Sequence, residues 1–211
     1  DAPRASWARY IFGVCREMIK RGVDVKGFNT AFAGDVPLGA GMSSSAALES
    51  AYAYALNDLF GDNKIDKFEL AKVGQATEHN YIGVKCGIMD QFASVFGKEG
   101  SLMRLDCRSL EYQYFPFKPE GYRLVLVDSV VKHELASSAY NKRRQSCENA
   151  VAAIAKKHEG VEFLRDCTLE MLAEVKEEIS AEDYMRAEYV IEEIQRVLDV
   201  CDALEKGDYE T

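Results

Sequence analysis

A glycine-rich turn that leads through serines into an alanine-rich helix constrains the fold of this chain most strongly. Positions 37–47 read PLGAGMSSSAA. Gly39 and Gly41 permit positive φ angles and a close approach of the backbone to a ligand. Serines cap helices well, and the first amides of a helix lack partners within it and carry partial positive charge. The segment therefore predicts either a phosphate-binding turn or a tight turn before a capped helix.

The flanks of this turn predict a strand before it and a helix after it. Positions 28–32 alternate large and small side chains, as a strand does. No Gly-Lys-Ser or Gly-Lys-Thr follows the glycines, which excludes a Walker-type nucleotide loop. In the helix, apolar residues at four-residue spacing predict one apolar face, formed by Ala47, Ala51, Ala55 and Leu59 with Leu48, Tyr52 and Leu56 beside them.

The whole pattern predicts an α/β (α+β) half followed by a mostly helical half. Helices are expected at 6–21, 66–81, 87–97, 140–158, 169–179 and 184–205, and strands at 101–105, 112–117 and 124–127. The run at 124–127 is apolar enough for a strand buried on both faces. Pro119 marks a candidate domain boundary within 118–121.

Composition indicates an acidic, folded protein. Apolar residues make up 47% of the chain, and 35 acidic against 26 basic residues give a net charge of −9. This balance argues against nucleic-acid partners, and no apolar run approaches the ~20 residues of a membrane span. The N-terminus lacks the pattern of a signal peptide. The six cysteines lack metal-type spacing, which favours reduced, mostly buried thiols in a cytoplasmic protein.

Two acids are candidates for chemistry near a bound phosphate. Asp90 lies in the segment CGIMDQ at 86–91, just inside an expected helix N-terminus that favours a carboxylate able to accept a proton. Glu78 could bind magnesium, for which one carboxylate and one hydroxyl are a usual protein share beside nucleotide phosphates. For each acid the alternative is a solvated helix face. Together with the turn, they fit phosphoryl transfer to a hydroxyl.

These segments resemble the GHMP small-molecule kinases, and within them the galactokinase family. The turn at 37–47 resembles the ATP loop of that superfamily. Positions 86–91, DCRSL at 106–110, SAYNKRR at 138–144 and LEKGD at 204–208 resemble galactokinase segments. The likeness runs from about Trp7 to the end of the chain.

The resemblance implies a fold, an activity and a location. The implied fold is GHMP-kinase-like, with a ribosomal-S5-type mixed sheet and helices followed by part of a mostly helical C-terminal domain. Residues 1–118 would belong to the ATP-binding N-terminal domain and 119–211 to the start of the C-terminal domain. The implied reaction is the ATP-dependent phosphorylation of galactose at its C1 hydroxyl, with Mg²⁺, in the cytoplasm. The oligomeric state stays open.

The resemblance also implies roles for individual residues. Asp90 would accept the proton of the anomeric hydroxyl, and Gly87 and Tyr140 would contact the sugar with it. Ser44 and Glu78 would bind magnesium. The ATP phosphates would be wrapped by Leu38, Gly39, Ala40, Gly41, Met42, Ser43 and Ser44.

The chain departs from the family pattern at both ends. It lacks the N-terminal GRVNLIGEH motif, which supplies a transition-state arginine and most sugar ligands, and the C-terminal GGGFGG motif. The expectation is therefore an internal fragment with little or no activity alone. Two alternatives remain for the intact protein: a kinase for a related sugar such as N-acetylgalactosamine, and a galactokinase-like sensor that binds galactose and ATP without catalysis. The intact SSSAA at 43–47 favours an enzyme.

Overall fold

The computed structural model describes residues 3–127 and 138–210, whose contacts form two compact units. Residues 3–114 and 120–127 fall in the first unit, and residues 115–119 and 138–210 in the second. Separate clusters of buried apolar side chains lie in each unit. The division into family domains at 118/119 stays a prediction.

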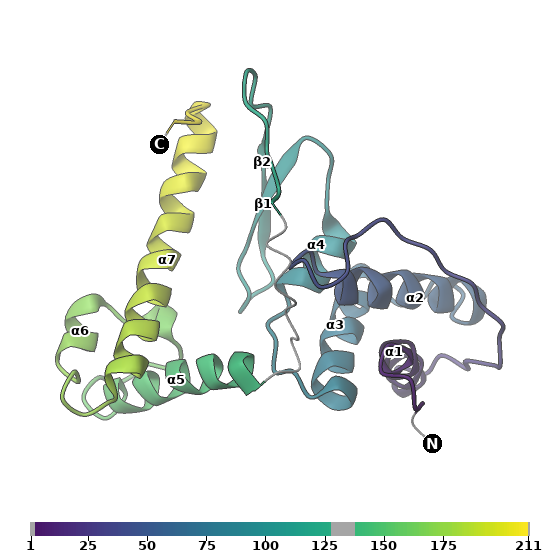
Figure 1. Cartoon of the computed structure of the whole chain (residues 1–211), viewed down its shortest axis with the longest axis horizontal. Coiled ribbons are helices and arrows are strands. Elements are labelled where there is room, and N and C mark those ends of the chain that lie inside the picture. The colour runs from purple at the N-terminus through teal and green to yellow at the C-terminus, as the bar shows by residue number, and fades with distance from the viewer. Residues whose placement is uncertain (1–2, 128–137, 211) are drawn as a thin grey trace. The chain divides into compact units, whose positions relative to one another are not determined.

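The regular secondary structure of the first unit is mostly helical (Figure 1). Its helices are α1 (Ala8–Lys20), α2 (Ser44–Phe60), α3 (Lys67–Thr77), the π-helix η1 (Glu78–Ile82) and α4 (Met89–Phe96). Strand β1 (Ser101–Leu105) follows, and β2 (Tyr112–Pro116), which pairs with β1, carries the chain into the second unit. Helices α1, α2 and α3 pack against one another, and α4 packs on α2 and α3.

Local sequence signals set two helix ends as predicted. The Asp66 side chain accepts a hydrogen bond from the Glu69 backbone N–H at 2.9 Å and so caps α3. Gly22 follows α1 with a φ of +86°, which glycine adopts without steric cost, and donates its N–H to the Ile19 carbonyl at 3.0 Å.

The apolar face predicted for α2 is buried only in part: Tyr52 and Leu56 are buried, but most of the alanine line beside them is not. The buried residues of α2 are Ala46, Glu49, Ser50, Tyr52, Ala53, Leu56 and Asn57. In contrast, Ala51, Ala55 and Leu59 are exposed. Alanine is the best helix former and is small enough for any face, so its periodicity alone does not identify the buried side.

The predicted strands are confirmed only where they pair with each other. The expectations at 101–105 and 112–117 correspond to β1 and β2. Residues 28–32 form no strand and instead lie along α2, where the Thr30 hydroxyl is 2.8 Å from the Tyr52 hydroxyl and the Phe32 ring packs edge-on against Tyr52. Residues 124–127 form no strand either, and their side chains are 75–86% exposed rather than buried on both faces.

The described residues therefore contain a two-stranded sheet in place of the expected mixed sheet. The reason is that a strand needs a partner for its backbone N–H and C=O groups. Among the described residues, 28–32 and 124–127 have no paired strand. The structure is mostly helical, with one small sheet.

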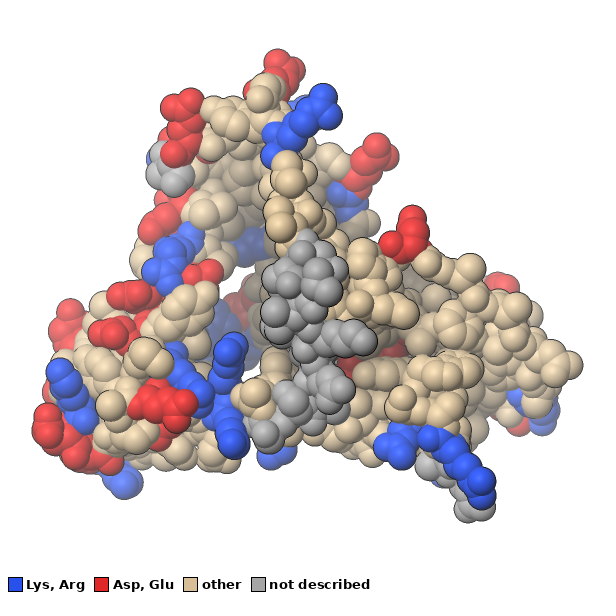
Figure 2. Space-filling model, viewed as in Figure 1, with Lys and Arg blue, Asp and Glu red and all other residues tan. Residues whose placement is uncertain are grey.

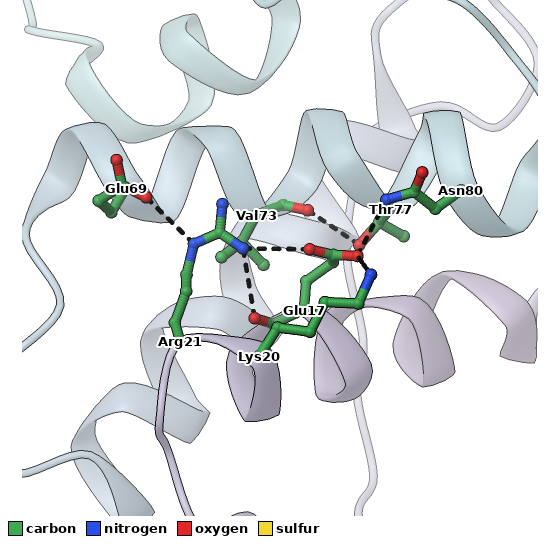
Figure 3. Close-up of polar contacts among 7 residues, drawn as sticks. All are labelled: Glu17, Lys20, Arg21, Glu69, Val73, Thr77 and Asn80. Carbon is green, nitrogen blue, oxygen red and sulfur yellow. Dashed lines mark hydrogen bonds and ion pairs between the residues drawn. The ribbon is translucent and has the colours of Figure 1, made fainter.

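A buried carboxylate joins α1 to α3 and η1 (Figure 3). Glu17 accepts hydrogen bonds from Lys20 at 2.6 Å, Arg21 at 3.1 Å and Asn80 at 3.0 Å. Arg21 also donates to Glu69 at 3.1 Å, at the start of α3. Burial raises the pKa of Glu17, but the hydrogen bonds from Lys20, Asn80 and Arg21 outweigh this and hold the pKa below its usual value.

The second unit is built from α5 (Ser138–Ile154), the short 3₁₀ helix η2 (Leu164–Asp166), α6 (Leu169–Ala173) and α7 (Ala181–Lys206). The three expected helices are present, although α6 ends earlier than predicted. Helix α7 buries Ala187, Cys201 and Leu204, while its apolar residues Ile194, Val197 and Leu198 are exposed.

Charged side chains of both signs are mixed on the face drawn in Figure 2, densely over α5, α6 and α7. All six cysteines are free, but only Cys167 and Cys201 are buried, fewer than expected, and Cys107 is exposed. Within the described part of the chain, no helix combines the length and hydropathy that a bilayer span requires.

Candidate active site

The turn before α2 is open around its glycines. Gly39 and Gly41 have φ angles of +71° and +73°, and a Cβ at either would meet no described atom within 4 Å. Ser43 precedes α2 in a left-handed conformation, with a φ of 55°, and its side chain makes no capping hydrogen bond to the described residues. The cap alternative thus lacks its defining bond. The first N–H groups of α2 remain suited to an anion.

The residues predicted to bind phosphate differ in how exposed they are. Leu38 and Met42 are exposed, as are the two glycines, whereas Ala40, Ser43 and Ser44 are partly buried. Ser44 is the first residue of α2. The backbone N–H and C=O groups of the turn are therefore covered by few side chains, as close binding of a phosphate by the backbone requires.

Three carboxyl groups on neighbouring helices approach one another below this turn. Glu49 lies on α2, Glu78 begins η1, and Asp90 lies in the first turn of α4. Glu49 and Glu78 are 0% and 2% exposed, while Asp90 is partly exposed. Asp90 lies in α4 on the side away from the buried residues Phe92, Val95 and Phe96.

Burial, together with nearby negative charge, raises the pKa values of Glu49 and Glu78. Burial, and then the charge of Glu78, raises the pKa of Glu49 to about 9. Burial also raises the pKa of Glu78, and a hydrogen bond from the Ser45 hydroxyl offsets part of this rise while the charge of Asp90 adds to it. Strongly shifted carboxyl groups of this kind are typical of functional sites.

Glu78 has the features that a magnesium ligand needs. Its Oε2 atom is buried and has no hydrogen-bond partner among the described residues. Carboxylate and hydroxyl oxygens suit Mg²⁺, which completes its shell with water and phosphate oxygens rather than a protein cage. No cluster of three or more acid, histidine or cysteine ligands occurs within the described ranges. The hydroxyl that bonds Glu78 is that of Ser45, whereas the sequence favours Ser44; the Ser44 assignment stays a prediction.

Two side chains contact the backbone of the segment that leads to Asp90. The Cys86 carbonyl oxygen lies 2.8 Å from His79 Nε2 and accepts a hydrogen bond from Gln75 Nε2 at 3.4 Å. Gly87 follows in an exposed position where a Cβ would meet no described atom within 4 Å. The predicted sugar contact at Gly87 therefore lies in open space three residues before Asp90.

Tyr140, the other predicted sugar contact, lies in the second unit. It is an exposed residue in the first turn of α5. The first unit brings together the turn, Glu78, Gly87 and Asp90, and the role of Tyr140 stays a prediction.

Sequence reasoning missed several residues around the three acids. Tyr10 of α1 lies close enough that, after burial, the charges of Glu78 and Glu49 raise its pKa to about 12. Ser45 and Glu49 were also missed. The burial of Glu49 could have been predicted from its spacing, because it lies three residues after Ala46 and four before Ala53 on the buried face of α2. The π-helix at Glu78, a distortion common at functional sites, has no such signal.

Comparison with known proteins shows what this chain is similar to. Residues 9–98 match the family model described as "GHMP kinases N terminal domain". Galactokinase of Thermotoga maritima is 47% identical over 205 residues, which cover 97% of this chain and 56% of that protein. Galactokinase of Thermosipho africanus is 42% identical over 205 residues, with the same coverage.

A solved structure agrees with the sequence relatives. Lactococcus lactis galactokinase, complexed with galactose, superposes with a TM-score of 0.84 at 27% identity, covering 98% of this chain and 53% of that one. The chain thus spans about half the length of the relatives it matches. Over this length it is similar to the galactokinases, with a GHMP-kinase-like fold, and its residues 9–98 match the GHMP kinase N-terminal domain model.

Proposed function

We propose that the full-length protein containing this chain is a galactokinase, which transfers the γ-phosphoryl group of ATP to the C1 hydroxyl of galactose in the cytoplasm. One observation carries the proposal. In a chain 47% identical to a galactokinase, the open start of α2, the unpartnered oxygen of Glu78 and the first-turn Asp90 belong to one compact unit.

The residues of this chain have distinct parts in the proposed reaction. The backbone from Leu38 to Ser44 binds the ATP phosphates at the N-terminus of α2, where oriented N–H groups and the helix dipole favour negative charge. Ser44 and Glu78 hold Mg²⁺, which neutralises charge on the phosphate oxygens when bound. These contacts orient the γ-phosphoryl group.

Asp90 accepts the proton of the C1 hydroxyl, and Gly87 and Tyr140 contact the sugar. In a loose transition state the proton leaves late, so a weakly basic carboxylate suffices when it is well placed. We further propose that residues 1–118 belong to an ATP-binding domain with a ribosomal-S5-type mixed sheet, and 119–211 to a mostly helical C-terminal domain.

The test is a D90N variant of the full-length protein, assayed for galactose-dependent ADP formation. Loss of a general base costs about 10²–10⁴-fold in rate, so turnover should fall by at least 100-fold while ATP binding persists. Glu99→Gln changes an exposed acid just after α4 and should leave turnover unchanged.

Each other outcome contradicts a named part of the proposal. Unchanged turnover in D90N would show that Asp90 is not the base. A wild-type protein that binds galactose and ATP without turnover would be a sensor, and one that prefers N-acetylgalactosamine would be a kinase for that sugar.

A further inference from the structure

We propose that Glu49 is a positioning residue: through its hydrogen bond to Gln91, it fixes the helix that carries Asp90 relative to the helix that begins at the phosphate turn. This inference rests on the proposed function, because it concerns the placement of the proposed base. Glu49 belongs to α2 and Gln91 to α4, and Gln91 is the residue directly after Asp90.

The hydrogen bond between Glu49 and Gln91 is buried. Gln91 Nε2 donates to Glu49 Oε2 at 3.2 Å, and the two residues are 2% and 0% exposed. Within the described ranges, the second oxygen of Glu49 and the side-chain oxygen of Gln91 have no hydrogen-bond partner. Removing either side chain therefore leaves the other as a buried polar group without its described partner, which is unfavourable.

Helix α3 leaves room for this bond at a single glycine. A Cβ on Gly74 would lie 2.7 Å from Gln91 Cγ and 3.1 Å from Glu49 Oε2. Gly74 is buried in the interior of α3, where glycine is a poor helix former compared with alanine. The glycine is thus explained by the space that the Glu49–Gln91 pair occupies, and three helices meet at this bond.

The Glu49–Gln91 bond, called the node below, affects where Asp90 lies relative to the phosphate turn. The phosphate turn is attached to the start of α2, and Asp90 is attached to the start of α4, so their separation depends on how these helices are held together. Burial raises the pKa of Glu49 to about 9, so at neutral pH the node holds a neutral acid rather than a buried charge. A displacement of about 1 Å at reacting groups can cost roughly 100-fold in rate.

The decisive experiment compares kcat and the affinity for ATP in variants of the full-length protein. Glu49→Met keeps the length and burial but removes the acceptor, and kcat should fall about 10- to 100-fold, with the Kd for ATP changed less than about 3-fold. Glu49→Gln retains an acceptor oxygen and should restore kcat to within about 3-fold of wild type. Gln91→Met should match Glu49→Met, and the double variant should be no slower than either single one, because the same bond is lost once.

Two further variants separate positioning from general stability. Gly74→Ala pushes on Gln91 Cγ and crowds Glu49 Oε2 without removing either polar group, and it should also lower kcat, so the inference remains testable if Glu49→Met folds poorly. The matched control is Asn57→Ala, on α2 but eight residues after Glu49. It removes a buried polar side chain that is hydrogen-bonded to the backbone of Ile65. It should lower the unfolding midpoint but leave kcat of the folded protein unchanged.

The outcomes distinguish this inference from the proposed function. If D90N abolishes turnover but Glu49→Met and Gly74→Ala turn over like wild type, Glu49 has no positioning role and the proposed function stands. Equal losses in Glu49→Gln and Glu49→Met would also overturn the role of the hydrogen bond. If the wild-type protein phosphorylates no sugar, both proposals fall together.

Discussion

Single glycines at helix crossings decide how closely the first unit packs. Gly74 makes room for two polar side chains, and Gly13 does the same for apolar ones. A Cβ on Gly13 would lie 2.5 Å from Thr77 Cγ2 and 3.1 Å from Tyr81 Cδ2, so α1 approaches α3 and η1 through this position. In the sequence both residues read only as weak helix formers, because the side chains that need the space are distant along the chain.

A Gly13→Ala substitution should therefore destabilise the protein. Alanine favours the helix by about 1 kcal/mol, but overpacking a tight contact costs typically 1–3 kcal/mol, and the clash involves a β-branched side chain with little freedom to move. The midpoint of urea unfolding should fall. At Gly27 an added Cβ meets no described atom within 4 Å, so Gly27→Ala is the control and should be neutral. A higher midpoint for Gly13→Ala would contradict the close approach.

At the scale of elements, the sequence predicts helices better than strands, because helix signals are local and strand pairing is not. Asp66 and Gly22 mark their helix ends through bonds within a few residues. The segments at 28–32 and 124–127 have strand-like composition, but composition does not supply a partner. The same distinction applies to the site. The turn and Asp90 could be predicted from local sequence motifs, whereas the approach of Glu49 to Glu78 depends on how α2, α3 and α4 pack.

The contacts of Glu17 between α1 and α3 should make the stability of the protein depend on pH. The folded-state pKa of Glu17 is lowered, so its contribution to stability is fully present above the unfolded-state pKa of about 4.3 and is lost as the pH falls through the folded value. Hydrogen bonds to charged groups contribute about 1.5–3 kcal/mol, so Glu17→Gln should lower the free energy of unfolding by on the order of 2 kcal/mol at pH 7.

Urea unfolding of wild type and Glu17→Gln from pH 7 to pH 3 measures this contribution. The difference between the two proteins should shrink below about pH 4.3, because acid protonates Glu17 in the wild type. Asp24→Asn removes an exposed partner of Lys26 and should change neither the stability nor its pH dependence. A constant difference at every pH would show that packing, rather than the charge of Glu17, holds α1 on α3.

At the scale of the whole molecule, each compact unit has buried apolar clusters of its own. In the first unit, Val14, Leu56 and Leu70 belong to a cluster formed by α1, α2 and α3. In the second, a separate cluster joins Ile154 of α5 and Leu172 of α6 to Ala187 of α7. Because stability in such proteins varies from one cooperative unit to another, the two units should respond independently to core substitutions.

Leu172→Ala should destabilise the second unit alone. Leu172 is fully buried, and truncating a buried leucine to alanine costs about 2–5 kcal/mol. Hydrogen exchange followed by mass spectrometry should show faster exchange in α5, α6 and α7 and unchanged protection in α1, α2 and α3. Leu70→Ala, also buried, should give the reverse pattern. If either substitution accelerates exchange in both units to the same extent, the molecule unfolds as one cooperative body, and the proposed nucleotide site in the first unit depends on the second unit for its stability.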